Sequence, residues 1–106
     1  MDARTRDRHV ARARVMKALA HPTRIFIIEE LASGEQCVCE LQAKIGADMS
    51  TVSKHLAQLR DSGIIRDERR GTQVYYSLQA TCIPRLMLCV ENVLKENARR
   101  HMEVAK

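Results

Sequence analysis

Four cysteines are the residues of this 106-residue chain that are best suited to chemistry. Cys37 and Cys39 are separated by one residue, and paired thiolates prefer soft acceptors such as arsenite, antimonite, Cd(II), Pb(II) or Zn(II) over hard cations. Both fall in a segment with helical periodicity, where side chains two residues apart point about 200° apart. Chelation of one ion by this pair is therefore expected to require local unwinding of the helix. The alternative is that both are small core residues.

Cys82 and Cys89 lie seven residues apart near the C-terminus. On one helix they would share a face but stand about 10 Å apart along the axis, so they cannot bind the same ion within that helix. Either is a candidate third thiolate for the first pair, and Cys82 is favoured because backbone deforms most easily at the start of a helix. Otherwise both pack in a dimer seam. Glu96, His101 and Glu103 are expected to be solvated.

The composition and the motifs of the chain exclude several classes of function. The net charge is +5 at pH 7, and 13 of the 18 basic residues are Arg, which favours a polyanionic partner. No nucleophile–base pair, carboxylate pair or phosphate-binding loop appears, so we expect no enzyme. The chain has no run of about 18 apolar residues that could span a membrane. Residues 1–19 lack the apolar block of a signal peptide, so we expect a cytoplasmic protein with reduced thiols.

The segments that must position these thiols have mainly helical periodicity. Apolar residues at helical spacing predict helices over residues 4–19, 22–34, 37–45, 50–63 and 82–100. Pro22 suits the first turn of the second helix, and Gly46 suits the end of the third. Ser50 is expected to cap the fourth helix, which Gly63 closes.

The third and fourth helices have the dimensions of a helix-turn-helix, since about four residues around a glycine join them. Residues 64–78 hold two β-prone runs on either side of a charged centre with one glycine, which predicts a β-hairpin. The predicted fold is therefore a mainly α winged helix-turn-helix of order α-α-α-α-β-β-α, with the hairpin as its wing. One domain covers residues 1–106, with the helix-turn-helix at 37–63, the wing at 64–78 and a dimerisation helix at 82–100.

The prediction of a homodimer depends on the last helix. Between residues 82 and 94 this helix is apolar on nearly all sides, which is more than one small core can cover. The residues in excess are Leu86, Met87, Val90, Val93 and Leu94. We expect a second subunit to cover them, together with the first helix.

The outward side of the fourth helix carries polar groups that can read base edges or contact phosphates in a major groove. These candidate DNA-binding residues are Ser50, Thr51, Ser53, Lys54, His55 and Gln58. Arg69, Arg70 and Gln73 at the wing tip can follow the DNA backbone or enter a narrow minor groove. The alternatives are a solvated helix face, a packed His55, and a charged tip that only prevents edge pairing.

Several ordered segments carry a family resemblance over nearly the whole chain. They are LAHPTRI (19–25), CVCEL (37–41), STVSKHL (50–56), LRDSGII (59–65) and RRGTQVYY (69–76). With this order and spacing the chain resembles the ArsR/SmtB family of winged-helix metalloregulators. The resemblance implies a homodimeric repressor, without a constitutive cofactor, that leaves double-stranded operator DNA when a soft metal or metalloid binds.

The sequence departs from its relatives at positions that concern the inducer. Arsenite repressors of this type usually carry a third Cys where this chain has Gln42, and zinc sensors use Asp and His near Ala80 and Cys82. We therefore expect As(III) or Sb(III) as inducer at Cys37 and Cys39, with a third sulfur from Cys82, Cys89 or an external thiol. Cd(II), Pb(II) and Zn(II) are the alternative ions.

Two other functions fit the same residues. One is a thiol-redox or persulfide switch on the same fold, in which the cysteines close into disulfide or polysulfide bridges. The other is an adaptor that uses the winged-helix scaffold to bind a protein and binds no DNA. The sequence names neither the operator nor the regulated genes.

Overall fold

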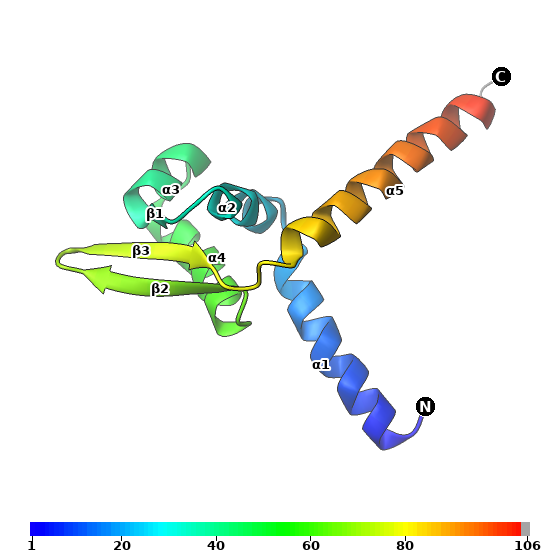
Figure 1. The fold of residues 1–106 in the computed structure, drawn as a ribbon, viewed down its shortest axis with the longest axis horizontal. Coiled ribbons are helices and arrows are strands. Elements are labelled where there is room, and N and C mark those ends of the chain that lie inside the picture. Colours follow the sequence, from blue (N-terminus) through cyan, green and yellow to red (C-terminus); the bar gives the residue numbers. More distant parts are fainter. Residues whose placement is uncertain (105–106) are drawn as a thin grey trace.

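The computed structural model describes residues 1–104, which form a small body from which two long helices extend (Figure 1). The elements follow one another as α1, α2, β1, α3, α4, β2, β3 and α5. This confirms the predicted winged helix-turn-helix and adds one strand, β1, that the sequence did not predict. The last two residues of the predicted domain, 105 and 106, lie outside the described residues.

The first two helices are α1 (Ala3–Leu19) and α2 (Pro22–Ala32). They are separate because Pro22 disfavours helical geometry at the residue before it, while its fixed φ suits the first helical position. The imidazole Nδ1 of His21 caps α2 by accepting a hydrogen bond from the backbone N–H of Thr23 at 3.1 Å. The predicted break at His21–Pro22 is thus confirmed.

The helix-turn-helix consists of α3 (Val38–Ile45) and α4 (Met49–Asp61). Gly46 ends α3 with a φ of 77°, a left-handed conformation that glycine adopts without strain. The predicted cap of α4 was wrong: Asp48 occupies the N-cap position, and Ser50 lies in the first turn. Asp48 has the extended backbone of a cap, and its carboxylate accepts hydrogen bonds from the hydroxyls of Ser50 and Thr51.

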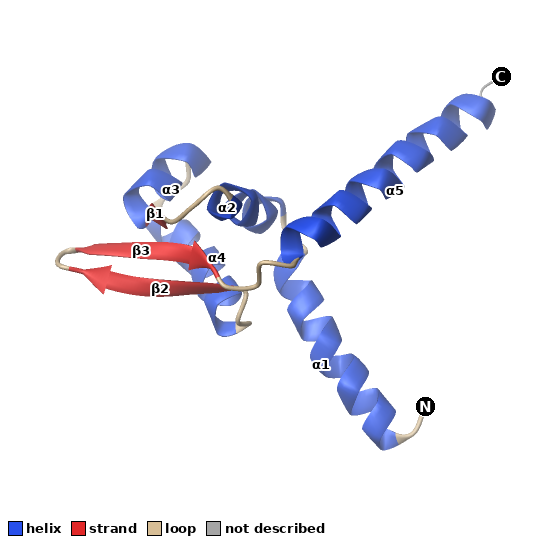
Figure 2. Ribbon diagram, in the orientation of Figure 1, coloured by secondary structure: helices blue, strands red, loops and turns tan. Residues whose placement is uncertain are grey.

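The wing is an antiparallel hairpin of β2 (Ile65–Arg70) and β3 (Gln73–Leu78), joined by a two-residue turn at Gly71 (Figure 2). A short third strand, β1 (Gln36–Cys37), pairs with the other edge of β3, so the strand order is β1-β3-β2. Two residues are too few to show a strand period. The sequence therefore assigned Cys37 to a helix, and that assignment was wrong.

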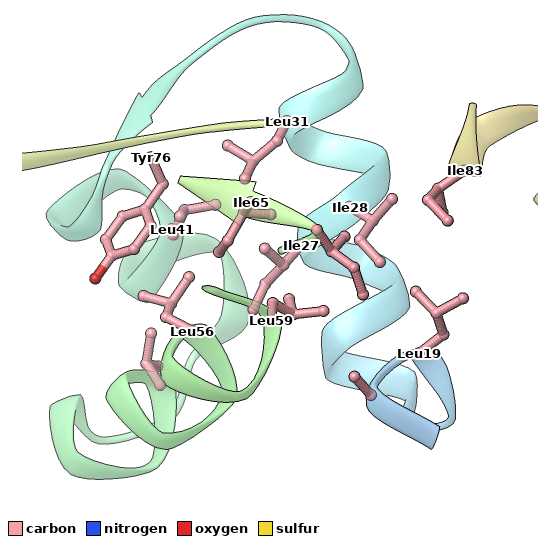
Figure 3. Packing of buried hydrophobic residues seen from close by; sticks show 13 residues of the cluster. Leu19, Ile27, Ile28, Leu31, Leu41, Leu56, Leu59, Ile65, Tyr76 and Ile83 are labelled. Carbon is pink, nitrogen blue, oxygen red and sulfur yellow. The ribbon is translucent and has the colours of Figure 1, made fainter. Parts of the chain in front are cut away.

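The hydrophobic core lies between α2, α3, α4 and the first residues of the wing (Figure 3). Its largest fully buried side chains are Ile27, Ile28, Leu41, Val52, Leu56, Leu59, Ile64 and Ile65. The apolar stripe predicted for the fourth helix, Val52, Leu56 and Leu59, is among them. The helix-turn-helix and the base of the wing are thus held by one core.

The last helix, α5 (Ile83–Val104), projects from the body, as does α1 (Figure 1). Ile83 is buried, and Leu86 and Met87 are half-buried against the core, so two of the five residues predicted for the dimer seam partly fill their own subunit. Val93 and Leu94 remain 54% and 56% exposed. None of the helices within residues 1–104 has the length and apolarity needed to cross a membrane.

Candidate nucleic-acid interface and thiol site

From Ser50 to Asp61, every exposed residue of α4 is polar. Thr51, Ser53, Lys54 and Gln58 are exposed, while the opposite side of the helix is buried in the core. Burial fixes the rotation of α4 about its axis, so these side chains point away from the body. Lys54 makes no ion pair within residues 1–104 and is available to a phosphate or a base.

The N-terminus of α4 is organised around the carboxylate of Asp48. The hydroxyl of Thr51 donates to Asp48 Oδ1 at 2.5 Å, and the hydroxyl of Ser50 donates to Oδ2. The Ser50 and Thr51 hydrogen bonds lower the pKa of Asp48 below its usual value, so the carboxylate stays ionised. In this arrangement the two hydroxyls present their oxygens outward, as acceptors for base amino groups.

His55 lies on the flank of α4 that faces α2. Its Nδ1 accepts a hydrogen bond from Arg24 Nε at 3.1 Å, and its ring centroid is 4.3 Å from that of His21. Burial lowers the pKa of His55, and the charges of His21 and Arg24 lower it further. The structure thus places His55 in a half-buried, packed position, and a contact between His55 and DNA stays a prediction.

The three wing-tip residues have different environments. Arg70 is held by its own chain: it donates to both carboxylate oxygens of Glu35, at 2.5 and 3.0 Å, and to Glu68 at 2.9 Å. Its guanidinium also lies 4.6 Å from the centre of the Tyr75 ring. The hydrogen bond from Arg70 lowers the pKa of Glu35. Arg69 is exposed and makes no ion pair within the described residues, whereas Gln73 faces the thiol segment.

The thiol pair lies where β1 meets α3. Cys37 is the extended residue that precedes α3, and its buried Sγ donates to Glu40 Oε1 at 3.2 Å. Cys39 is exposed in the first turn of α3, and its Sγ donates to Gln73 Oε1 at 3.5 Å. Cys37 also pairs with Tyr75 in the sheet. Both thiols are therefore connected to strand β3 of the wing.

This position changes the geometric argument about chelation. Cys37 has φ −77° and ψ 158°, so the two cysteines do not occupy consecutive positions of one helix. The angle of about 200° expected for an intact helix does not apply, and unwinding of α3 is not a geometric requirement for chelation. The premise of that sequence prediction was wrong because a strand too short to predict holds Cys37.

The other two cysteines lie elsewhere. Cys82 immediately precedes α5 and Cys89 lies within it, and both are exposed. Figure 1 shows β1 and α3 on the far side of α2 from α5. Within residues 1–104 of one subunit, no three His, Cys, Asp or Glu side chains come together to hold an ion. A single subunit thus offers the pair Cys37 and Cys39 without a third protein ligand.

Sequence reasoning missed Glu35, Arg24 and the role of Gln73 as a partner of Cys39. Each of these contacts joins residues more than 30 positions apart: 35 for Arg70 to Glu35, 34 for Cys39 to Gln73 and 31 for Arg24 to His55. Local periodicity carries no signal for them.

Comparison with known proteins adds a family match. The sequence profile described as "Bacterial regulatory protein, arsR family" matches residues 21–67, which include α2, α3 and α4. The arsenic resistance transcriptional regulator ArsR1 of Pseudomonas putida is 46% identical over 65 residues, which are 60% of this chain and 51% of ArsR1. The chain spans about half the length of the curated relatives it matches, for example 58% of the biofilm growth-associated repressor of Xylella fastidiosa.

Solved structures match over a larger share of both chains. The homodimeric winged helix-turn-helix DNA-binding domain of Mycobacterium bovis is 32% identical, with a TM-score of 0.78, and the match covers 95% of this chain and 94% of that domain. The transcriptional repressor BigR of Xylella fastidiosa is 30% identical, with a TM-score of 0.71, and the match covers 88% of this chain and 96% of BigR.

Proposed function

The chain belongs to the ArsR family of bacterial regulatory proteins, and from this premise we propose that it is a homodimeric transcriptional repressor that binds double-stranded operator DNA. We propose further that arsenite or antimonite, bound at Cys37 and Cys39, releases it. The observation that carries the first proposal is the exposed polar face of α4, fixed by the buried face opposite. Members of this family are regulators and not enzymes.

DNA binding is assigned to α4 and the wing. The first turns of α4 present hydroxyl oxygens and Lys54, and its C-terminal half presents Gln58; such groups recognise base edges and phosphates in a major groove. Arg69 at the wing tip is free to reach the adjacent backbone. Arg70 reaches a phosphate only by leaving Glu35, so we expect it to contribute less than Arg69 and Lys54.

Release is assigned to the junction between the thiols and the wing. Cys37 and Cys39 must lose their protons to bind a soft ion, and as thiolates they no longer donate to Glu40 and Gln73. Both side chains must also turn toward a common point. Because Cys37 pairs with Tyr75 in the sheet, this movement acts on β3 as well as on α3. An ion that binds the rearranged state more tightly than the DNA-bound state shifts the protein off its operator.

The choice of ion is supported by thiolate chemistry and by similarity to a named arsenic resistance regulator. Trivalent arsenic favours three sulfurs, and one subunit supplies two at this site. We propose that the third comes from Cys82 or Cys89 of the partner subunit, with a small external thiol as the alternative. Arsenic X-ray absorption on the wild type and on the Cys82→Ser and Cys89→Ser variants counts these sulfurs.

The test of this function is release of DNA by arsenite. An operator duplex is first selected from random DNA on the wild-type protein, and its binding is followed by fluorescence anisotropy. Sodium arsenite should release the wild type, whereas Cys37→Ser and Cys39→Ser should bind with wild-type affinity and resist release. Cys82→Ser and Cys89→Ser are measured beside them, and whichever of the two still releases the DNA does not supply the third sulfur. Arsenite release that survives both substitutions would refute the assigned site.

A thiol-redox or persulfide switch is the second candidate. Two observations favour it: all four cysteines are free thiols, with Cys39 exposed, and the repressor BigR is similar over most of this chain. An oxidant or a polysulfide should then release the DNA without arsenite, and dithiothreitol should restore binding. If dithiothreitol-reversible release occurs while arsenite has no effect, this candidate replaces the first.

A further inference from the structure

A basic cleft of about 480 Å³ lies between α1, α2 and α4, and among its lining residues only Gln58 has been assigned to a function so far. Its charged lining comes from Arg14 and Lys17 of α1 and Arg24 of α2. Gln58 of α4 and Ser62, the residue that follows α4, form the opposite wall. Three helices thus bring three cations and the side-chain amide of Gln58 to one concave surface.

The positive charge of this cleft is not neutralised by the chain itself. Within residues 1–104, no carboxylate lies within 4.0 Å of a charged nitrogen of Arg14, Lys17 or Arg24. Arg60, by contrast, is paired with both Asp61 and Asp67. Arg24 is held in place by neutral groups, because Nη1 donates to the Ala18 carbonyl at 3.3 Å and Nε to His55. A fixed guanidinium and two unpaired cations favour an anion.

The position of the cleft indicates which anion. Gln58 belongs both to the cleft wall and to the exposed polar face of α4. It follows Thr51 by seven residues, which is about 10 Å along a helix axis. A major groove is about 12 Å wide. When the first turns of α4 lie in the groove, its C-terminal half therefore approaches the sugar–phosphate backbone at the groove edge.

We propose that this cleft binds a backbone phosphate of the duplex that α4 reads, so that α1 is part of the DNA interface as well as of the dimer. The inference rests on the proposed function, since it requires DNA along α4. Arg14 and Lys17 neutralise the phosphate, and Arg24 is the positioned guanidinium at the base of the cleft. The side-chain amide of Gln58 faces the same phosphate from the other wall, whereas the Ser62 hydroxyl already donates to the Gln58 carbonyl at 2.8 Å and only lines that wall.

The experiment uses the full chain and the duplex selected on the wild type. Affinity is measured over a series of KCl concentrations for the double variant Arg14→Gln/Lys17→Gln. One phosphate contact changes the slope of log affinity against log salt by about 0.9, so two clefts in a dimer should make it shallower by about two. Arg8→Gln/Arg12→Gln is the charge-matched control, because it also removes two positive charges and both residues are exposed on the side of α1 away from Arg14 and Lys17. Failure to select any duplex would count against the proposed function and not against the cleft alone.

Phosphate-ethylation interference is the second readout, and it does not depend on the dimerisation strength of the variants. Ethylating the phosphate seated in the cleft should weaken binding of the wild type and leave binding of the double variant unchanged. An unchanged salt slope together with an identical interference pattern would overturn the proposal. So would calorimetric binding of inorganic pyrophosphate that the double variant abolishes without any change in the salt slope, because the cleft would then serve a small anion.

Discussion

The contact region between the thiol segment and the wing (residues 35–39 with 70–75) differs sharply from the part of α5 that lies beyond its first turns (residues 88–104). In the first region, polar side chains find partners within the chain, as Arg70 does with Glu35 and Cys39 does with Gln73. In the second, Val90, Val93 and Leu94 continue the stripe begun by Ile83 beyond the body, where they remain exposed within the described residues 1–104. The polar contacts of the first region form within one subunit, whereas we expect a second subunit to cover the apolar residues of the second region.

This difference separates two kinds of function in one small chain. Exposed apolar surface along a projecting helix is suited to permanent association, because its burial is favourable whatever the inducer does. Paired polar groups are suited to switching, because an exposed ion pair contributes only up to about 1 kcal/mol of stability. A contact with DNA or with an ion can therefore replace it at a small cost in free energy. We therefore expect substitutions in α5 to act on assembly and substitutions near β1 to act on affinity and response.

The largest effect is expected for Val90→Asp. A carboxylate in the dimer seam should give monomers, because burying an unpaired charge costs several kcal/mol. Loss of the second half-site should weaken operator binding by about 100-fold or more. Sedimentation velocity measures the first effect and anisotropy the second. Asn92→Asp adds the same charge about 200° around α5 and should remain dimeric. A dimeric Val90→Asp would mean that the seam lies elsewhere.

Two basic residues of the proposed DNA-facing surface also differ in whether the chain itself pairs them: Lys54 makes no ion pair within residues 1–104, and Arg70 is paired with Glu35 and Glu68. Lys54→Ala should make the salt dependence of operator binding shallower by about two for a dimer, at about 0.9 per phosphate contact. Arg70→Ala should change it less, because Glu35 and Glu68 already hold that guanidinium. Equal effects of the two substitutions would show that Arg70 leaves Glu35 when DNA binds.

A smaller effect of opposite sign is expected for Glu35→Gln. The substitution removes a negative charge beside the wing and frees Arg70 to reach a phosphate. Exposed ion pairs are worth up to about 1 kcal/mol, so operator affinity should rise by about two- to five-fold. Glu29→Gln, an exposed residue on α2, is a control for the change in net charge alone. A loss of affinity in Glu35→Gln would instead identify the ion pair as a support of the DNA-binding wing.

The smallest effect concerns His55, a side chain that packs within the body. Its pKa is lower in the folded chain than the unfolded value of about 6.5, mainly because of burial. Between these two pKa values the unfolded chain binds a proton that the folded chain does not, so the free energy of unfolding should fall as the pH drops below about 6.5. The Tm of the wild type should fall between pH 7.5 and pH 5, and the Tm of His55→Gln should fall by less. An identical decrease in both proteins would show that His55 remains solvated.

The sequence by itself determined the type and order of the long elements. Helices of two or more turns repeat their apolar positions, so the buried residues of α4, the break at Pro22 and the helix end at Gly46 were all predictable. The exposed candidates Thr51, Ser53, Lys54 and Gln58 followed from the same stripe, because burial of one face exposes the other. The excess of Lys and Arg over Asp and Glu likewise indicated an anionic partner.

Only the tertiary structure decided how the site residues are used. The extended conformation of Cys37 depends on pairing with a strand 38 residues later in the chain, and the roles of Arg70, Gln73 and His55 depend on partners 31 to 35 residues away. A local pattern reports which face of an element is buried, whereas the partner of a polar side chain is set by packing of the whole core. For this reason the sequence could identify the two thiols, but only the folded chain connects them to the wing.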